Sequence, residues 1–214
     1  QTPEALAHCR WADWKSSARV AFDDLATRHE KVFIVGLSMG ALIALSLGHE
    51  RGGRVGGIAA LAVPLTLPLL DQTALSLIKR LPFASLLPLA PKKGGPDVSD
   101  RSLAATMRTY NRIPLSAAAS LLDGQAEARD RAPRISVPVF VGHGRYDHTA
   151  PVSNAHELFS LLRTPHRQLV VYPRSWHILT LDQDHIAVRR HVAEFFLAPR
   201  KRIHISAAST AARL

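Results

Sequence analysis

One short turn constrains the fold of this chain more than any other feature of its sequence. Residues 36–40 read Gly-Leu-Ser-Met-Gly; they follow the apolar, β-branched run 31–35 and open a stretch of strong helix formers, 38–50. A serine between two glycines at this spacing, with a strand before it and a helix after it, is typical of a tight strand-to-helix turn. The turn therefore predicts a βα unit in which the strand and the helix approach each other closely.

The same turn has the pattern of a nucleophile elbow. Small residues at Gly36 and Gly40 are expected to leave room for the strand and the helix, and Ser38 is expected to have a strained backbone with its hydroxyl exposed. The Met39 backbone N–H, near the helix N-terminus, would point to where an oxyanion forms. The alternative is a glycine-rich turn in which the serine is incidental.

Strand-like and helix-like stretches alternate along most of the chain, which predicts an α/β fold with a mostly parallel sheet. A long stretch, 64–136, interrupts the alternation with several helix-like pieces and a loop at 91–96. Such a long insertion between two strands is expected to lie over the sheet. The expected strands are 31–35, 55–63, 137–141 and 168–172, and the expected helices are 38–50, 71–81, 101–110, 114–131, 153–162 and 184–197.

Two further residues are expected at the same edge of the sheet as Ser38. A serine nucleophile needs a base, and the base needs an orienting carboxylate. Asp147 follows the strand 137–141 and His177 follows the strand 168–172, in the chain order that this motif uses. The carboxyl ends of parallel strands share one edge, so we expect Ser38, Asp147 and His177 to meet there.

Other polar residues nearby compete for these roles. His143 and His148 flank the acid loop, where we expect a surface or strand-end role for both. Asp182 and Asp184 could orient His177, but are expected to cap the last helix.

The chain is strongly basic, with 27 Lys and Arg against 17 Asp and Glu, a net charge of +10. These residues are scattered, apart from a run at 200–202, and a solvated surface with a basic tail is the expected meaning. Binding of nucleic acid or an anionic membrane through the tail remains an alternative. Aromatic residues make up only 6%, which leaves little material for base stacking, so no nucleic-acid partner is expected.

The sequence offers little for a metal or a membrane. Its one cysteine, Cys9, excludes an intramolecular disulfide framework, and no His-Glu-x-x-His pattern is present, so no metal or cofactor is expected. Residues 1–14 lack the apolar region of a signal peptide. The longest uncharged run, 55–70, is short for a membrane span and contains two prolines. We expect a cytoplasmic protein without stable membrane insertion.

Four stretches together resemble the α/β-hydrolase superfamily, and within it the bacterial carboxylesterase and monoacylglycerol lipase branch. The similarity extends over nearly the whole chain, from about residue 2 to 197. The stretches are the elbow 35–40, the acid loop 144–151, the histidine loop 175–182 with its sequence Ser-Trp-His-Ile-Leu-Thr-Leu-Asp, and Trp-Ala-Asp-Trp at 11–14.

The resemblance implies a partial α/β-hydrolase fold, with the last four strands of the family's sheet and a helical cap. The family's N-terminal part, which holds its first strands and a second oxyanion donor, is not expected in this chain. The implied organisation is a core with the elbow at 1–63, the cap at 64–136, a core with the acid and histidine loops at 137–199 and a basic tail at 200–214.

The resemblance also implies a serine hydrolase that cleaves carboxylic esters through an acyl-enzyme. Ser38 is then the nucleophile, His177 the general base and acid, and Asp147 the orienting acid. The alternatives are an inert or binding-only hydrolase fold, and a thioesterase or acyltransferase with the same triad. Apolar cap residues suggest a fatty or aromatic acyl group, unless they pack the cap's own core; they are Leu65, Leu67, Leu69, Leu70, Leu75, Leu77, Ile78, Leu81 and Phe83.

Overall fold

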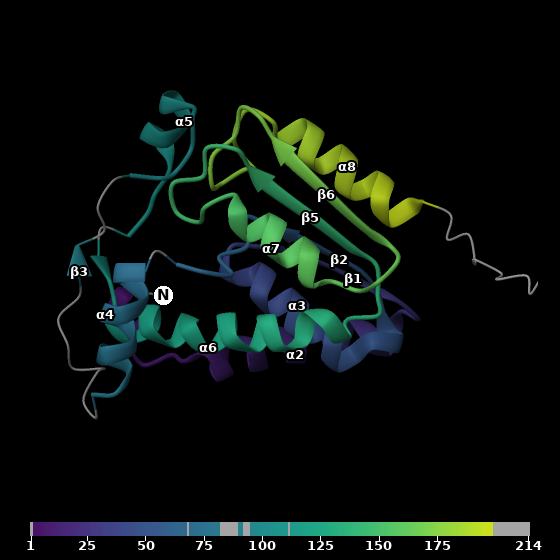
Figure 1. Ribbon diagram of the computed structural model, residues 1–214, viewed down its shortest axis with the longest axis horizontal. Coiled ribbons are helices and arrows are strands. Elements are labelled where there is room, and N and C mark those ends of the chain that lie inside the picture. Colours follow the sequence, from purple (N-terminus) through teal and green to yellow (C-terminus); the bar gives the residue numbers. More distant parts are fainter. Residues whose placement is uncertain (1, 68, 82–89, 92–94, 111, 199–214) are drawn as a thin grey trace, which may run out of the picture.

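Four parallel strands form the central sheet (Figure 1). The computed structural model of the protein describes residues 2–67, 69–81, 90–91, 95–110 and 112–198. The strand order is β1-β2-β5-β6, and every neighbouring pair is parallel. The strands are β1 (Val32–Leu37), β2 (Val55–Leu61), β5 (Val139–Gly144) and β6 (Arg167–Tyr172). The expected α/β class and parallel sheet are confirmed.

Helices connect the strands and flank the sheet. Of the expected helices, α5 is shorter than 101–110, because the backbone becomes extended at Met107. The loop expected at 91–96 is wrong at its first residue, because Pro91 pairs with Arg112 in a two-stranded antiparallel ribbon. The helices are α1 (Pro3–Ala7), α2 (Trp11–Arg28), α3 (Met39–Arg51), α4 (Leu69–Lys79), α5 (Arg101–Thr106), α6 (Leu115–Arg131), α7 (Ser153–Leu161) and α8 (His185–Leu197); the ribbon strands are β3 (Ala90–Pro91) and β4 (Arg112–Ile113), and short 3-10 helices span Gly52–Arg54 and Ala132–Arg134.

The central strands are buried on both faces. Successive side chains of a strand point to opposite faces, and both sets are apolar here. Ile58 and Val139 pack in the core beneath α2, α3, α6 and α7, whereas Leu61 and Phe140 pack with Val188 of α8 on the other face. This two-sided burial is why the strands read as continuous apolar runs. Among the described helices, α8 alone covers this face of the sheet (Figure 1).

The insertion between β2 and β5 contributes to the main core. α6 packs along α3 and α2, and α4 packs against α6, whereas α5 lies apart from the sheet (Figure 1). Of the apolar residues expected to contact an acyl group, Leu65 is part of the main core and Leu75 is buried, but Leu77 and Leu81 are exposed. The side chains at 69, 70 and 83 lie outside the described residues. The domain boundaries remain a prediction.

β1 lies at one edge of the sheet. Within the described chain it pairs with β2 alone, and Phe33 and Val35 are 44% and 55% exposed. An apolar groove of about 360 Å³ runs beside it, lined in part by Phe22 and Ile43. Within the described chain, β1, the strand that leads into the elbow, therefore has a hydrogen-bonded neighbour strand on one side.

A network of ion pairs joins α2, α3 and α6. Glu50 accepts hydrogen bonds from Arg131 at 2.6 Å and from Arg19 at 2.8 Å. Glu127 accepts hydrogen bonds from the Trp11 indole at 2.7 Å and from Lys15 at 2.9 Å. Burial alone would raise the pKa of Glu50, but its two arginine partners outweigh burial and lower the pKa to about 2.

This lowered pKa predicts an acid-dependent loss of stability. The folded-state pKa of Glu50 lies below its ordinary value of 4.5, so its stabilising contribution is complete above pH 4.5 and is lost as the pH falls toward 2. Because Glu50 and Arg131 remain partly open to solvent, at 16% and 23% exposure, which screens the pair, we expect a contribution on the order of 1 kcal/mol. Urea unfolding of Glu50→Gln at pH 7 and pH 3 should show a weaker pH dependence than that of the parent chain. The matched control is Asp24→Asn, which removes an exposed pair with Arg28; equal pH dependence in all three proteins would contradict this prediction.

Within the part of the chain that the structure describes, no helix is both long and apolar enough to cross a membrane. The basic tail expected at 200–214 lies outside that part.

Candidate active site

Ser38 lies in the strained turn that the sequence predicts. Its backbone has φ 55° and ψ −123°, and its N–H donates to the carbonyl of Leu61 at the end of β2 (2.9 Å). A residue other than glycine in such a conformation costs on the order of 1–3 kcal/mol, which the surrounding structure must supply. Met39 is the first residue of α3, where a backbone N–H has no acceptor within its own helix.

The two glycines of the turn have different roles. A Cβ at Gly36 would lie 2.1 Å from the carbonyl oxygen of Gly40, so only glycine lets α3 approach β1 this closely. Among the residues that the structure describes, no atom would lie within 4 Å of a Cβ at Gly40. The expectation that both positions must be small is therefore wrong for Gly40, because Gly40 faces the open groove beside β1.

This difference predicts opposite outcomes for two alanine substitutions. Gly36→Ala should push α3 away from β1 and lower the free energy of unfolding by about 1–3 kcal/mol or more. Gly40→Ala should be neutral or slightly stabilising, since alanine favours the helix over glycine by about 1 kcal/mol. Thermal and urea unfolding of both variants measures this. Equal destabilisation by the two substitutions would contradict the contact geometry.

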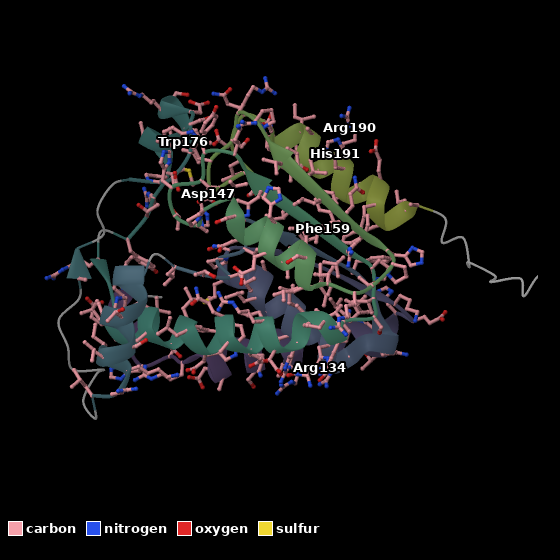
Figure 2. The ribbon with its side chains drawn as sticks, viewed as in Figure 1. Arg134, Asp147, Phe159, Trp176, Arg190 and His191 are labelled. Atoms are coloured by element: carbon pink, nitrogen blue, oxygen red, sulfur yellow. The ribbon has the colours of Figure 1, made fainter. Side chains whose placement is uncertain are left out.

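The structure brings Ser38, His177 and Asp147 into one hydrogen-bonded chain. His177 Nδ1 lies 2.8 Å from Asp147 Oδ2, and His177 Nε2 lies 2.9 Å from Ser38 Oγ. The carboxylate accepts the Nδ1 proton, which leaves Nε2 to accept the hydroxyl proton of Ser38. Figure 2 shows Asp147 and the neighbouring Trp176 in the loops between the strand ends and α5.

Four donors surround the Asp147 carboxylate, whose side chain is 0% exposed. Oδ1 accepts from the backbone N–H groups of Thr149 (2.9 Å) and Ala150 (2.7 Å). Oδ2 faces His177 Nδ1 and, at 3.1 Å, His143 Nε2. Burial would raise the pKa of Asp147, but the hydrogen bonds from His143 and His177 outweigh it and lower the pKa to about 2. Asp147 is therefore ionised at neutral pH.

The histidine loop crosses directly over the end of β5. A Cβ at Gly144 would lie 2.2 Å from the carbonyl oxygen of Trp176, so a larger residue would push the loop away. The Arg145 N–H also donates to the Tyr172 carbonyl at the end of β6 (2.9 Å). These contacts set the distance between Asp147 and His177.

A segment from the insertion, Asp97–Ser99, joins the acid and histidine loops. The Asp97 carboxylate accepts from the His148 N–H (3.1 Å) and the Thr149 hydroxyl (2.8 Å), and its carbonyl accepts from the Ile178 N–H (3.1 Å). Sequence reasoning missed this segment, because a polar residue after a Gly-Pro loop is typical of any turn.

The competing residues have other partners. Ser99 and the Trp176 N–H donate to Asp182, which anchors the histidine loop to the insertion. Asp184 lies at the N-cap position of α8, but its side chain accepts from Arg174 and Ser175 instead. The expectation that both aspartates cap the helix is therefore wrong for their side chains. Neither bonds to His177 in the described part of the structure.

The two flanking histidines differ sharply. The His148 side chain is exposed, in agreement with the expected surface role, and packs edge-on against Trp176 at 4.4 Å between ring centroids. His143 has the expected strand-end position, next to the last residue of β5, but it is fully buried against Asp147, so a surface role is wrong for it.

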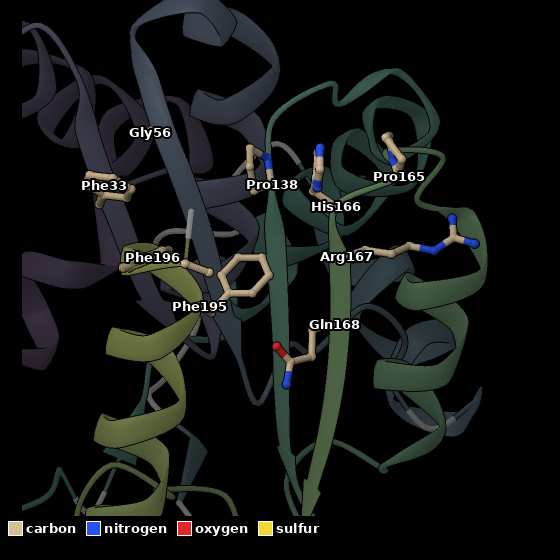
Figure 3. Close-up of a pocket in the computed structure, with 10 residues that line it drawn as sticks. Phe33, Gly56, Pro138, Pro165, His166, Arg167, Gln168, Phe195 and Phe196 are labelled. Carbon is tan, nitrogen blue, oxygen red and sulfur yellow. The ribbon is translucent and has the colours of Figure 1, made fainter. Parts of the chain in front are cut away.

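A cavity of about 400 Å³ lies at the opposite end of the sheet (Figure 3). Phe33, Phe195 and Phe196 line it together with Arg167, the first residue of β6, and His166 just before it. Because Phe33 and Arg167 lie at the amino-terminal ends of β1 and β6, this cavity is separate from the cluster of Ser38, His177 and Asp147 at the carboxyl ends. Among the described residues, no group of three or more His, Cys, Asp or Glu is placed to hold a metal ion.

The parallel sheet, the elbow and the loops at the carboxyl ends of its strands define an α/β-hydrolase. Comparison with known proteins gives the family: the chain belongs to the serine aminopeptidase S33 family, whose model matches residues 8–184. It is 25% identical over 197 residues to a carboxylesterase of Bacillus subtilis (strain 168), covering 90% of this chain and 75% of that protein. It is 24% identical over 193 residues to a thermostable monoacylglycerol lipase of Bacillus sp. (strain H-257), covering 90% of this chain and 73% of that protein.

Solved structures agree on the fold. A lipolytic enzyme from a study of the metagenome-derived LipS and LipT superposes with a TM-score of 0.81 at 24% identity, over 92% of this chain and 77% of its own. The monoacylglycerol lipase of Paleococcus ferrophilus gives a TM-score of 0.75 at 18% identity, over 88% of this chain and 76% of its own. The expected resemblance to the esterase and lipase branch of the α/β-hydrolases is confirmed.

Proposed function

We propose that this protein is a serine hydrolase that cleaves carboxylic esters through an acyl-enzyme. The observation that carries the proposal is the continuous chain of hydrogen bonds from Asp147 through His177 to Ser38. The similarity to a carboxylesterase and a monoacylglycerol lipase supports an ester as the substrate. The family's description as aminopeptidases makes amides the comparison substrate.

In the proposed mechanism, Ser38 Oγ attacks the ester carbonyl as its proton passes to His177 Nε2. The tetrahedral oxyanion lies against the Met39 N–H, at the positive end of α3. Asp147, ionised and fixed by its four donors, stabilises the imidazolium and holds the tautomer that leaves Nε2 free. His177 then protonates the leaving alcohol, and water, deprotonated by the same nitrogen, releases the acid from Ser38.

The acyl group is proposed from the apolar residues of the insertion. Leu77 and Leu81 are exposed, so they are not taken up by the insertion's own core and stay available to an apolar acyl chain. Assays of this proposal should therefore use a series of esters with increasing acyl length. We also propose that the acyl group is apolar, that the protein is cytoplasmic and that the cap spans 64–136.

The test is hydrolysis of short-chain p-nitrophenyl esters by this chain and by its Ser38→Ala variant. Turnover that disappears in the variant supports the proposal. Equal rates from two folded proteins would overturn it. An aminoacyl p-nitroanilide, assayed in parallel, separates esterase from aminopeptidase activity, and faster cleavage of the anilide than of every ester would also overturn the ester assignment.

A further inference from the structure

A second histidine contacts the acid of the proposed triad. His143 lies on β5 with its side chain 0% exposed. Its Nε2 is 2.9 Å from the carbonyl oxygen of Ala150 and 3.1 Å from Asp147 Oδ2. The proposed mechanism leaves this buried histidine without a role.

The contacts of His143 fix its tautomer. The Ala150 carbonyl is only an acceptor, so His143 Nε2 must carry the proton. The other ring nitrogen, Nδ1, is buried and has no hydrogen-bond partner in the described structure. A proton there would be a buried, unsatisfied donor, so the ring is neutral and donates from Nε2 alone.

The Nε2–H group that donates to the Ala150 carbonyl also lies 3.1 Å from Oδ2, the Asp147 oxygen atom that His177 uses. Thr149 and Ala150 hold Oδ1 of Asp147 through their N–H groups, but neither limits Oδ2 directly. His143 and His177 approach Oδ2 from two directions, and only His143 is held on a strand of the sheet. His143 therefore blocks rotation of the carboxylate and spreads its charge over a second donor.

We propose that His143 is a positioning residue for hydrolysis, which acts through Asp147 to hold His177 in line with Ser38. This inference rests on the proposed function. The alternative is a purely structural role, in which the His143–Ala150 hydrogen bond closes the acid loop without affecting the chemistry.

Three variants separate these roles. His143→Leu removes the donor, whereas His143→Gln keeps an amide N–H near the position of Nε2. His191→Leu is the matched control, because His191 stacks on Tyr172 of the same sheet without contacting Asp147. Reactive serine in each protein is counted by end-point titration with a fluorophosphonate, and kcat is expressed per titrated site.

We expect His143→Leu to lower kcat about 10- to 100-fold, the effect of losing a hydrogen bond to a charged group, with KM nearly unchanged. His143→Gln should recover most of this loss, and His191→Leu should keep the parent kcat. A His143→Leu protein that lost only titratable sites, with kcat per site unchanged, would overturn the inference. Equal losses in the Leu and Gln variants would also overturn it.

A measurement without turnover keeps the two proposals distinguishable. In Ser38→Ala protein labelled with ¹⁵N-histidine, the His143 ring should be neutral at pH 7 with its proton on Nε2. Introducing His143→Leu there should shift the Nδ1–H resonance of His177. A proton on His143 Nδ1, or an unchanged His177 resonance, would overturn this inference even if the parent chain has no esterase activity.

Discussion

The Ser38→Ala variant should lose ester hydrolysis to the background rate. The expected fall in kcat is on the order of 10⁶-fold, the loss seen when the nucleophile of a comparable triad is removed. In the parent chain His177 Nε2 lies 2.9 Å from Ser38 Oγ and can take its proton. Alanine has no hydroxyl, so His177 has nothing to activate and no acyl-enzyme can form. Steady-state hydrolysis of a p-nitrophenyl ester measures the loss, with uncatalysed hydrolysis as the baseline.

The substitution should leave the fold intact. Removing the hydroxyl changes no backbone contact of the elbow. Alanine and serine both have a Cβ, so the conformational cost of φ 55° is similar for the two residues. The thermal unfolding midpoint should therefore stay close to that of the parent chain. A fluorophosphonate should add one adduct to the parent chain, at the peptide that contains Ser38, and none to the variant. Labelling at another residue would contradict the assignment of the nucleophile.

Asp147→Asn should lower kcat about 10⁴-fold, as in other triads where the acid becomes an amide. An amide in the same place donates to His177 Nδ1 instead of accepting from it, which puts the His177 proton on Nε2 and removes the base. The loss is in kcat, so KM should change little.

The same substitution should also destabilise the protein. The site presents four donors to the carboxylate, two at each oxygen atom, and asparagine has only one oxygen. Turned toward Thr149 and Ala150, the NH₂ group faces two N–H donors, and turned toward His177 it faces the His143 N–H, so either orientation costs about 1–3 kcal/mol. Urea unfolding and activity per titrated serine separate the two effects. Asp24→Asn, the exposed pair with Arg28, is the control; if Asp147→Asn kept full kcat per site, Asp147 would not be the orienting acid.

The sequence predicts much of this fold because its signals are local. The elbow is one: Gly36 between an apolar strand and a helix former predicts the close approach of β1 and α3, which the clash with Gly40 confirms. The central strands β2 and β5 were recognisable because burial on both faces makes them largely apolar runs. The parallel order then follows from alternation with helices.

Contacts between distant segments were not predictable in this way. Nothing local distinguishes Asp97, in a loop after Gly-Gly-Pro, from the aspartate of an ordinary turn, yet it bonds to the acid loop about 50 residues later along the chain. In the sequence, His143 is likewise one more histidine at a strand end, and only the structure shows it buried against Asp147. At Gly40 the motif misled in the opposite direction. It predicted that the position must be small, whereas the structure shows an open groove beside it.

The hydrogen bond between His177 and Ser38 joins positions 139 residues apart. During synthesis, Ser38 and its elbow emerge early, whereas His177 becomes available only after the insertion and β6 are complete. Contacts of such long separation are slow to form, because the loop entropy is lost before the contact stabilises anything. In refolding, helix content should therefore recover first and hydrolysis last, so the appearance of activity marks the final strand pairing.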